Sequence, residues 1–361
     1  GTSCDDGDAN TNNDVIQSDG CTCAGTIGNP CDNNGGDADG DGYPDLFVGA
    51  RNIPGSYGVP PMSFLLKSKK GFGLEMLNKE RYGMITDSHW VDLDNDDDLD
   101  LVFCGDWMKI TVLENQNDGT LKFRTDNLGF ENSAGLWNTL AFYDFNGDGQ
   151  LDILAGNAGK NFKWKANATQ PVRLYVTDLD GNGQTEPMIF YPAFGEYRPY
   201  AGLDQLKSQV PAIRKQFLTY DQYTKVEDIS DFDLFNDEKL VEKRAIQELR
   251  SMLYLSDNGK YKGVALPDAA QRSTIQDFII RADGTVYFVG NNADYLTELG
   301  KNKSNAGGLI KDFDLTTGTF LTYESLRLTQ SLNPRKIVAL DNGELLIMCN
   351  NQDAYLFDPE E

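Results

Sequence analysis

The sequence predicts an all-β fold of the β-propeller type, with a small helical insertion and a short cysteine-rich segment at its start. Two observations predict this fold class. Short apolar runs rich in β-branched and aromatic residues recur along the chain, and a Gly, Asn or Pro soon follows each one, which is typical of strands. An acidic nine-residue pattern also recurs, directly before several of these runs. Four-stranded sheets repeated around an axis are the architecture that repeats in this way.

The first 36 residues differ from the rest of the chain because they contain almost no apolar side chains. Four of the six cysteines lie here, at Cys4, Cys21, Cys23 and Cys31. Zinc is one interpretation of the Cys-Thr-Cys sequence, but its spacing differs from the usual CxxC ligand pair and its surroundings are acidic. We therefore expect a disulfide-stapled module over residues 1–36, with three pairings open. Disulfides indicate an extracytoplasmic, oxidising location.

Strand-like runs fill the remainder, so we expect one propeller domain over residues 37–361. The clearest runs are Leu46–Val48, Leu99–Phe103, Leu151–Leu154, Pro187–Phe190, Thr285–Val289 and Leu345–Met348. Six blade units are visible in the sequence, and a seventh is left open. Cys104 and Cys349 lie inside apolar runs, which predicts that both are core thiols.

One region, about residues 203–250, favours helix over strand. Apolar residues keep helical spacing in its first half, at Leu206, Val210, Ile213 and Phe217. A second stretch runs from Leu240 to Leu249. We interpret this region as an insertion between strands.

The acidic pattern occurs in four loops, which begin at residues 37, 92, 144 and 178. Side-chain oxygens stand at positions 1, 3, 5 and 9 of each loop, and position 7 would contribute a backbone carbonyl. Gly at position 6 permits the left-handed turn that wraps the chain around an ion, and Asp97 holds that place in the second loop because Asp also tolerates this conformation. Two later units, at residues 281–285 and 340–344, keep the strand but lack these oxygens. The predicted metal-ligating residues are Asp37, Asp39, Asp41, Tyr43, Asp45, Asp92, Asp94, Asp96, Asp98, Asp100, Asp144, Asn146, Asp148, Gln150, Asp152, Asp178, Asp180, Asn182, Gln184 and Glu186.

This ligand pattern indicates a hard cation, and calcium fits best because it accepts about six to eight oxygens in irregular geometry. Magnesium is less apt, since it demands a regular octahedron. An EF-hand would close with a Glu at position 12 between helices, whereas these loops close at position 9 and a strand follows. The other interpretation, four solvated acidic turns, leaves close carboxylates repelling each other. We expect three to four structural calcium ions.

These loops resemble the FG-GAP/VCBS repeats of bacterial and integrin-type propellers. The resemblance extends to VCBS-repeat proteins of the ASPIC/UnbV-associated type through Arg51–Leu66, Gly83–Trp90, Gly105–Met108, Gly156–Gly159 and Gln209–Phe217. The cysteine-rich start is similar to small modules appended to secreted proteins of Bacteroidetes. This resemblance implies a propeller at the cell surface or outside the cell, and it implies location and fold more than activity.

The charge of the chain restricts its partners. There are 56 Asp and Glu residues against 32 Lys and Arg, which gives a formal net charge of -24. Such a polyanion repels nucleic acids and anionic lipid headgroups, so we expect neither as a partner. No apolar run approaches the roughly 20 residues that span a bilayer, so we expect no membrane insertion. The expected partners are a surface protein or a glycan, or a larger extracellular or outer-membrane complex.

Residues for catalysis are scarce in the sequence. The single histidine, His89, has no GxSxG, HExxH or Walker A motif beside it, and we interpret it as a packing or hydrogen-bonding residue. Arg173, Lys160 and Lys163 are basic residues that a polysaccharide lyase could use, but they form no recognisable set. We therefore assign no catalytic or cofactor-binding residue, and favour a secreted or cell-surface binding or scaffolding module. The alternatives are a lyase-like extracellular enzyme and an accessory subunit of an outer-membrane assembly.

Aromatic residues gather in predicted turns, and they allow two interpretations. Rings in loops can stack on sugars or anchor a partner protein, and they can also pack between neighbouring blades. We favour packing. The residues concerned are Trp107, Trp137, Trp164, Tyr191, Phe194, Tyr197 and Tyr200.

Overall fold

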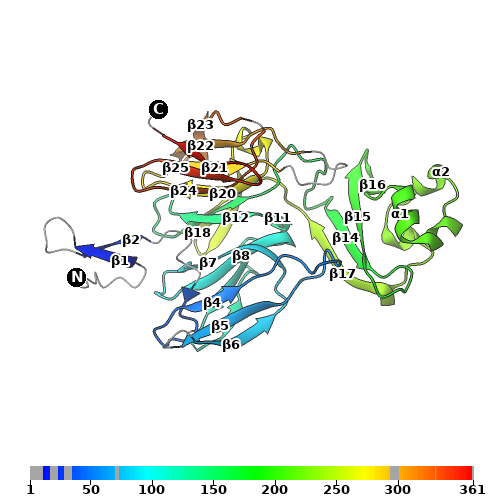
Figure 1. The fold of residues 1–361 in the computed structure, drawn as a ribbon, viewed down its shortest axis with the longest axis horizontal. Coiled ribbons are helices and arrows are strands. Elements are labelled where there is room, and N and C mark those ends of the chain that lie inside the picture. Colours follow the sequence, from blue (N-terminus) through cyan, green and yellow to red (C-terminus); the bar gives the residue numbers. More distant parts are fainter. Residues whose placement is uncertain are drawn as a thin grey trace.

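The computed structural model describes residues 11–16, 23–27, 35–69, 73–116, 118–292, 301–329 and 331–359. Within these ranges strands dominate, and the prediction of a β-propeller is confirmed. Five sheets follow one another in chain order as blades, and the first strand of each packs beside the first strand of the next. In Figure 1 the first blade lies at one end of this series and the fourth and fifth lie at the other.

The blades have these strands. The first contains β3 (Gly35–Gly36), β4 (Asp45–Val48), β5 (Ser63–Lys69) and β6 (Gly73–Glu80). The second contains β7 (Met84–Val91), β8 (Asp100–Met108), β9 (Thr111–Asn115), β10 (Leu121–Phe123) and β11 (Gly135–Leu136). The third contains β12 (Thr139–Tyr143), β13 (Asp152–Gly156), β18 (Met252–Asp257) and β19 (Lys260–Ala265). The fourth contains β20 (Ile275–Ile280), β21 (Val286–Gly290), β22 (Gly307–Asp314) and β23 (Thr319–Ser325). The fifth contains β24 (Pro334–Ala339), β25 (Leu345–Cys349) and β26 (Tyr355–Phe357).

A sixth sheet is inserted into the third blade, between β13 and β18. Its strands are β14 (Val172–Thr177), β15 (Glu186–Ala193), β16 (Glu196–Pro199) and β17 (Leu240–Ile246). It stands beside the series of blades and carries helices on one side (Figure 1). The unit that begins at residue 178 therefore lies in this inserted sheet rather than in a blade of the series.

The helices lie mainly between β16 and β17. They are α1 (Leu203–Gln209), η1 (Pro211–Lys215), α2 (Tyr220–Tyr223), η2 (Ile229–Asp231) and η3 (Asp237–Lys239), and the short η4 (Ala270–Arg272) precedes the fourth blade. Among the residues that the structure describes, no helix is long and apolar enough to span a membrane.

The predicted helical insertion is partly correct. The residues with helical spacing are all buried, from Leu206 to Phe217, and pack against β15 and one another. The second predicted stretch is wrong, because residues 240–246 form β17, which pairs antiparallel with β14. Pairing along the whole of β14 satisfies more backbone groups than an isolated helical turn would, and this outweighs the local apolar spacing.

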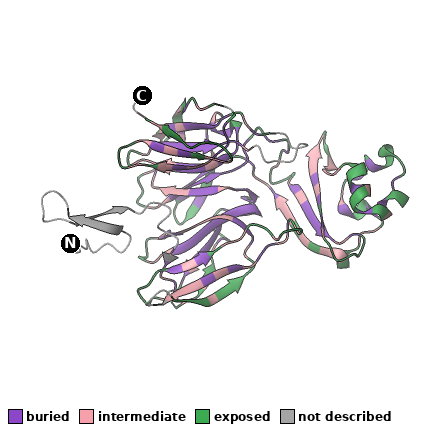
Figure 2. Cartoon of the chain, viewed as in Figure 1, coloured by how far each residue is buried: buried purple, intermediate pink, exposed green. Residues whose placement is uncertain are grey.

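The cores lie between successive sheets, where buried residues of neighbouring blades meet (Figure 2). Trp90 fills the first of these interfaces, Trp137 the second and Phe288 the third, and each is almost completely buried. A separate cluster joins the second blade to the inserted sheet. Cys104 is buried as predicted, whereas Cys349 is only half-buried at the last blade.

Neighbouring blades are also joined by a recurring carboxylate. Asp87 in β7 accepts a hydrogen bond from the backbone N–H of Leu140 in β12, at 2.7 Å. Asp277 in β20 accepts one from the backbone N–H of Ile337 in β24, at 2.9 Å. Both carboxylates therefore hold the first strand of one blade against the first strand of the next.

At the start of the chain, β1 (Thr11–Ile16) pairs antiparallel with β2 (Cys23–Ile27). The disulfides predicted for residues 1–36 involve cysteines that lie outside the described residues, apart from the backbone of Cys23. The first blade begins at Gly35, two residues before the predicted domain boundary.

Glycines lie at irregularities in two strand pairs, β7 with β8 and β20 with β21. A Cβ on Gly105 would lie 1.9 Å from the carbonyl oxygen of Met84, and a Cβ on Gly290 would lie 1.8 Å from that of Thr274. The register shifts beside each of them. No side chain fits there unless the backbone moves.

We predict that Gly105→Ala lowers the free energy of unfolding by about 2 kcal/mol or more, because the added methyl meets a backbone carbonyl. Chemical denaturation measures this loss. The matched control is Gly202→Ala, since nothing lies within 4 Å of that position. Equal losses in the two variants would contradict the assigned close approach.

Candidate metal centres

Each acidic loop joins two consecutive strands that pair antiparallel within one sheet. The loops at residues 37–45, 92–100 and 144–152 join the first strand of a blade to its second strand, and the loop at 178–186 joins β14 to β15. The two later units join their strands with short turns instead, closed by hydrogen bonds such as that from the N–H of Gly284 to the carbonyl of Arg281. The loss of the acidic side chains thus coincides with a shorter connection.

The backbone of each loop wraps around its first side chain. The Asp37 carboxylate accepts hydrogen bonds from the N–H groups of Asp41 and Gly42, and Asp144 accepts from Gly147 and Gly149. This wrapping needs a left-handed residue at position 6. Its φ is positive in all four loops, at Gly42, Asp97, Gly149 and Gly183. The expectation that Asp97 replaces glycine there is confirmed, with φ of 68°.

The ninth side chain connects each loop to its sheet. In the third loop, Asp152 accepts hydrogen bonds from the N–H of Phe145, at 2.8 Å, and from the N–H of Ser256 in β18, at 2.7 Å. Asp45 makes the same pair of contacts with Ala38 and Ser68. These ninth-position carboxylates are buried because they begin the second strand of the sheet.

The hydrogen bond between the ninth-position carboxylate and the third strand also identifies β18 as the third strand of its blade. Asp100 accepts from the N–H of Asn115 in β9, at 3.0 Å, as Asp152 does from Ser256 in β18. Ser256 stands 104 residues after Asp152 in the sequence. The inserted sheet therefore interrupts the third blade without changing how its acidic loop is held.

Two loops bring three acids close enough to hold one ion. Carboxylate oxygens of Asp37, Asp39 and Asp45 lie within 4.8 Å of one another. The same is true of Asp92, Asp94 and Asp96 in the second loop. In the third and fourth loops, Asn146 and Asn182 replace one acid each, and no such group of three acids is found among the described residues there.

Several of these oxygens are buried and have no hydrogen-bond partner. They are Oδ1 of Asp39, Oδ1 of Asp94 and Oδ2 of Asp100. Burying a carboxylate oxygen without a donor is costly, so such atoms are rare in stable folds unless a cation satisfies them. This donor set, made only of oxygens, fits calcium.

Burial and mutual repulsion raise the pKa values of several of these acids. Burial and the neighbouring charge of Asp96 raise the pKa of Asp98 to about 6. Burial raises the pKa of Asp100 to about 7, although the N–H of Asn115 acts in the opposite direction. Burial also raises the pKa values of Asp45, Asp152 and Glu186. A divalent cation in the loops would favour the ionised forms of these groups.

Basic side chains that the sequence analysis did not consider lie against the first two loops. The Lys67 ammonium in β5 contacts Asp39 and lies 2.9 Å from Asp41. The Arg124 guanidinium contacts Asp94. Hydrogen bonds from Lys67 lower the pKa of Asp41. Each of these cations sits on a neighbouring strand or turn, so no local pattern in the sequence pointed to it.

In the third loop, uncharged side chains rather than basic ones donate hydrogen bonds to the acid at position 5. The Ser256 hydroxyl donates to Asp148 at 2.7 Å, and the Asn146 amide donates to the same carboxylate at 3.1 Å. At position 7 the structure shows a backbone hydrogen bond within the loop, and the predicted role of the position-7 carbonyl as a metal ligand stays a prediction. The N–H of Tyr43, Gln150 and Gln184 donates in each case to the side chain at position 5.

The other candidates of the sequence analysis have structural contacts. His89 lies 3.1 Å from Asp87 through Nε2 and meets the ring of Phe142 edge-on, which confirms a packing and hydrogen-bonding role. Arg173 pairs with Asp228 and stacks on Tyr197. Lys160 pairs with Asp268, and Lys163 lies over the rings of Tyr191 and Tyr200. The structure does not bring these three basic residues together.

The aromatic residues mostly pack, as predicted. Trp107, Trp137 and Trp164 are at least nine-tenths buried. Trp107 and Trp164 contact each other between the second blade and the inserted sheet. Phe194 is the exception, because it is fully exposed at the turn between β15 and β16.

Comparisons with known proteins match the region of the central loops. The model of the FG-GAP-like repeat matches residues 92–155, and that of the FG-GAP repeat matches residues 136–175. The chain therefore contains FG-GAP repeats, as the resemblance implied, whereas its likeness to ASPIC/UnbV-associated proteins stays a prediction. No curated protein matches the chain.

A solved structure also shows a likeness. It is the extracellular domain of a hybrid two component system from B. thetaiotaomicron, with 12% sequence identity and a TM-score of 0.21. The match covers 94% of this chain and 40% of that one. The present chain thus spans less than half the length of that protein chain.

We predict that Lys67→Met raises the affinity of the first loop for a divalent cation several-fold, because the ammonium no longer competes for Asp39 and Asp41. Calorimetric titration of the variant with calcium measures this. The control is Lys225→Met, which removes an exposed lysine paired only with Asp221 in the helical insertion. Unchanged affinity in Lys67→Met would show that the lysine does not compete with the ion.

Proposed function

We propose that this chain is a calcium-stabilised β-propeller that works outside the cell as a binding or scaffolding module. The observation that carries the proposal is the set of buried carboxylate oxygens without donors in the acidic loops. Their repetition in equivalent places supports a metal that belongs to the fold.

Calcium would be held by the residues of each loop at positions 1, 3, 5 and 9, with the carbonyl of position 7. The first two loops offer the strongest sites, because each gathers three carboxylates. The third and fourth loops would use Asn146 and Asn182 at one position each. The ligands also close the turn and anchor the second strand, so the ion would be structural, and three to four ions per chain are expected.

An extracellular location follows from the same chemistry. Calcium sites of extracellular modules have dissociation constants of about 10⁻⁴–10⁻³ M, so even weak sites in acidic loops would be occupied outside the cell. The predicted disulfides of residues 1–36 would require an oxidising compartment as well. The net charge of -24 disfavours nucleic acid and anionic membrane surfaces as partners.

Binding is better supported than catalysis. The basic residues considered for a lyase are each paired or stacked in separate places, and His89 is held by Asp87. A surface protein or a glycan is therefore the proposed partner, either free or within a larger extracellular or outer-membrane complex.

The test is a substitution whose effect depends on calcium. Asp94→Asn should remove about 2–4 kcal/mol of stabilisation in millimolar calcium and much less in chelator, because the stabilising ion is absent in chelator. Thermal melting of wild type and variant in both buffers measures this. Asp126→Asn is the control, since Asp126 is an exposed acid outside the loops. Equal losses in calcium and in chelator would rule out Asp94 as a ligand.

A further inference from the structure

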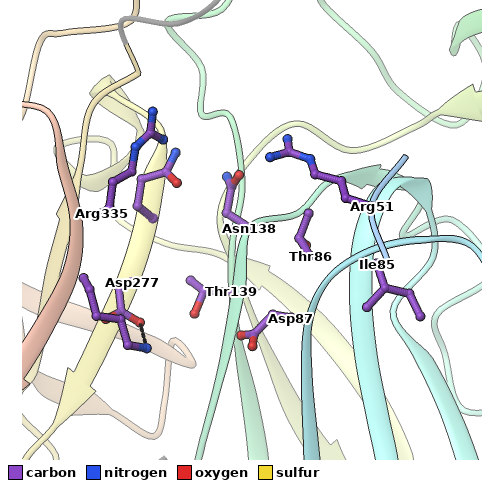
Figure 3. A pocket seen from close by; sticks show the side chains of 10 residues that line it. Arg51, Ile85, Thr86, Asp87, Asn138, Thr139, Asp277 and Arg335 are labelled. Atoms are coloured by element: carbon purple, nitrogen blue, oxygen red, sulfur yellow. Dashed lines mark hydrogen bonds and ion pairs between the residues drawn. The ribbon is translucent and has the colours of Figure 1, made fainter. Parts of the chain in front are cut away.

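The first strands of the blades surround an open cavity of about 330 Å³. It is lined by residues of β7, β12, β20 and β24, together with Arg51 from the loop after β4 (Figure 3). None of the acidic loops contributes to it. Its volume lies within the range of about 300–1,000 Å³ that is typical of small-molecule sites.

The carboxylates of this cavity are already used by the protein. Asp87 accepts hydrogen bonds from the N–H of Leu140 and, at 3.1 Å, interacts with His89. Asp277 accepts from the N–H of Ile337 and lies 3.0 Å from the Lys336 ammonium. Both acids therefore hold neighbouring blades together, and neither is left as the main attraction for a ligand.

Donors dominate the opposite end of the cavity. The guanidinium groups of Arg51 and Arg335 lie on either side of Asn138, away from Asp87 and Asp277 (Figure 3). The Arg51 side chain is 58% exposed, and Asp106 fixes its orientation through two hydrogen bonds. Gln276 also lines the cavity, and its side-chain Nε2 is buried without a hydrogen-bond partner. An acceptor supplied by a ligand would satisfy the Nε2 donor of Gln276.

A second cavity, of about 310 Å³, adjoins the first because Arg51 and Asn138 line both. Its other walls are aromatic or apolar at Tyr57, Leu136, Phe162 and Trp164, and polar at Asn52 and at Asp106, whose charge is paired with Arg51. Trp164 is 4% exposed, and its indole N–H is buried without a hydrogen-bond partner. This is a second unpartnered donor, on a different element from Gln276. Each cavity thus has one unpaired donor, Gln276 in the first and Trp164 in the second, and Arg51 lines both cavities.

We propose that this double cavity binds a short acidic saccharide, with its carboxylate between Arg51 and Arg335 and a neighbouring sugar ring in the aromatic half. A carboxylate suits arginine because its two oxygens can accept parallel hydrogen bonds from the planar guanidinium group. Sugar hydroxyls supply acceptors for Gln276 and Trp164, and aromatic walls suit the apolar face of a sugar ring. This proposal gives a ligand class to the binding role proposed above, and it rests on residues outside the calcium loops.

A saccharide is favoured over an acidic peptide by the lining of the aromatic half, because aromatic side chains suit the apolar face of a sugar ring. A peptide side chain would place a flexible chain there and would leave the indole N–H without a fixed acceptor. The overall charge of -24 also disfavours long polyanions, so a short ligand is expected.

Calorimetric titration of the calcium-loaded protein with digalacturonic acid tests the proposal. The control ligand is the dimethyl ester of the same disaccharide, which keeps the rings and loses the charge. We expect the acid to bind with a Kd of about 1 mM or tighter and the ester at least about tenfold more weakly. Equal binding of acid and ester, or binding of neither, overturns the proposal.

Two variants locate the site. Arg335→Gln should weaken binding of the acid about tenfold, and Trp164→Phe several-fold, because one loses the charge and the other only the N–H donor. Arg51 is kept, since its loss would leave the buried Asp106 without its partner. Arg214→Gln, an exposed arginine of the helical insertion, is the control. Wild-type affinity in both cavity variants overturns the site.

The outcomes also separate this proposal from the calcium module. If digalacturonate does not bind but the melting temperature still depends on calcium, only the saccharide site is overturned. Tighter binding of a glutamate dipeptide than of the disaccharide overturns the choice of a saccharide. Both results leave the calcium assignment to its own test.

Discussion

The buried carboxylate at the ninth position of the acidic loops is the constraint on which the first three blades depend. It begins the second strand, and in the three blade loops it accepts a backbone N–H from the third strand. Because a buried carboxylate must keep its hydrogen bonds, it holds the loop in one conformation. In the first two loops, this conformation brings the carboxylate oxygens of three acids close together. Calcium would complete this arrangement by satisfying the oxygens that the protein leaves without donors.

The position of the inserted sheet follows from the same constraint. Ser256 meets Asp152 as Ser68 meets Asp45, so the third blade keeps its geometry although a sheet and several helices separate its two halves. The insertion can vary without disturbing the blade because its two ends leave and return at adjacent strands. It also supplies Trp164 to the wall of a cavity beside the blades.

The loops were predictable from the sequence because their acidic and amide side chains lie within nine residues and form one local turn. Asp97 was predicted to adopt the left-handed conformation on its own chemistry, and it does. The strand at 240–246 was not predictable, since its apolar spacing also fits a helix and only pairing with β14 decides between them. Lys67, Arg124 and the cavity residues come from separate segments that read as ordinary strand positions, so only the fold brings them together.

If calcium is part of this fold, as proposed, a melting curve combined with metal analysis will show it most directly. Dialysed protein is compared in calcium, in magnesium and in chelator. We expect three to four bound calcium ions per chain and a large rise in melting temperature with calcium alone. No bound calcium and no change in melting temperature would mean that the loops are only acidic turns, and that the fold does not depend on calcium.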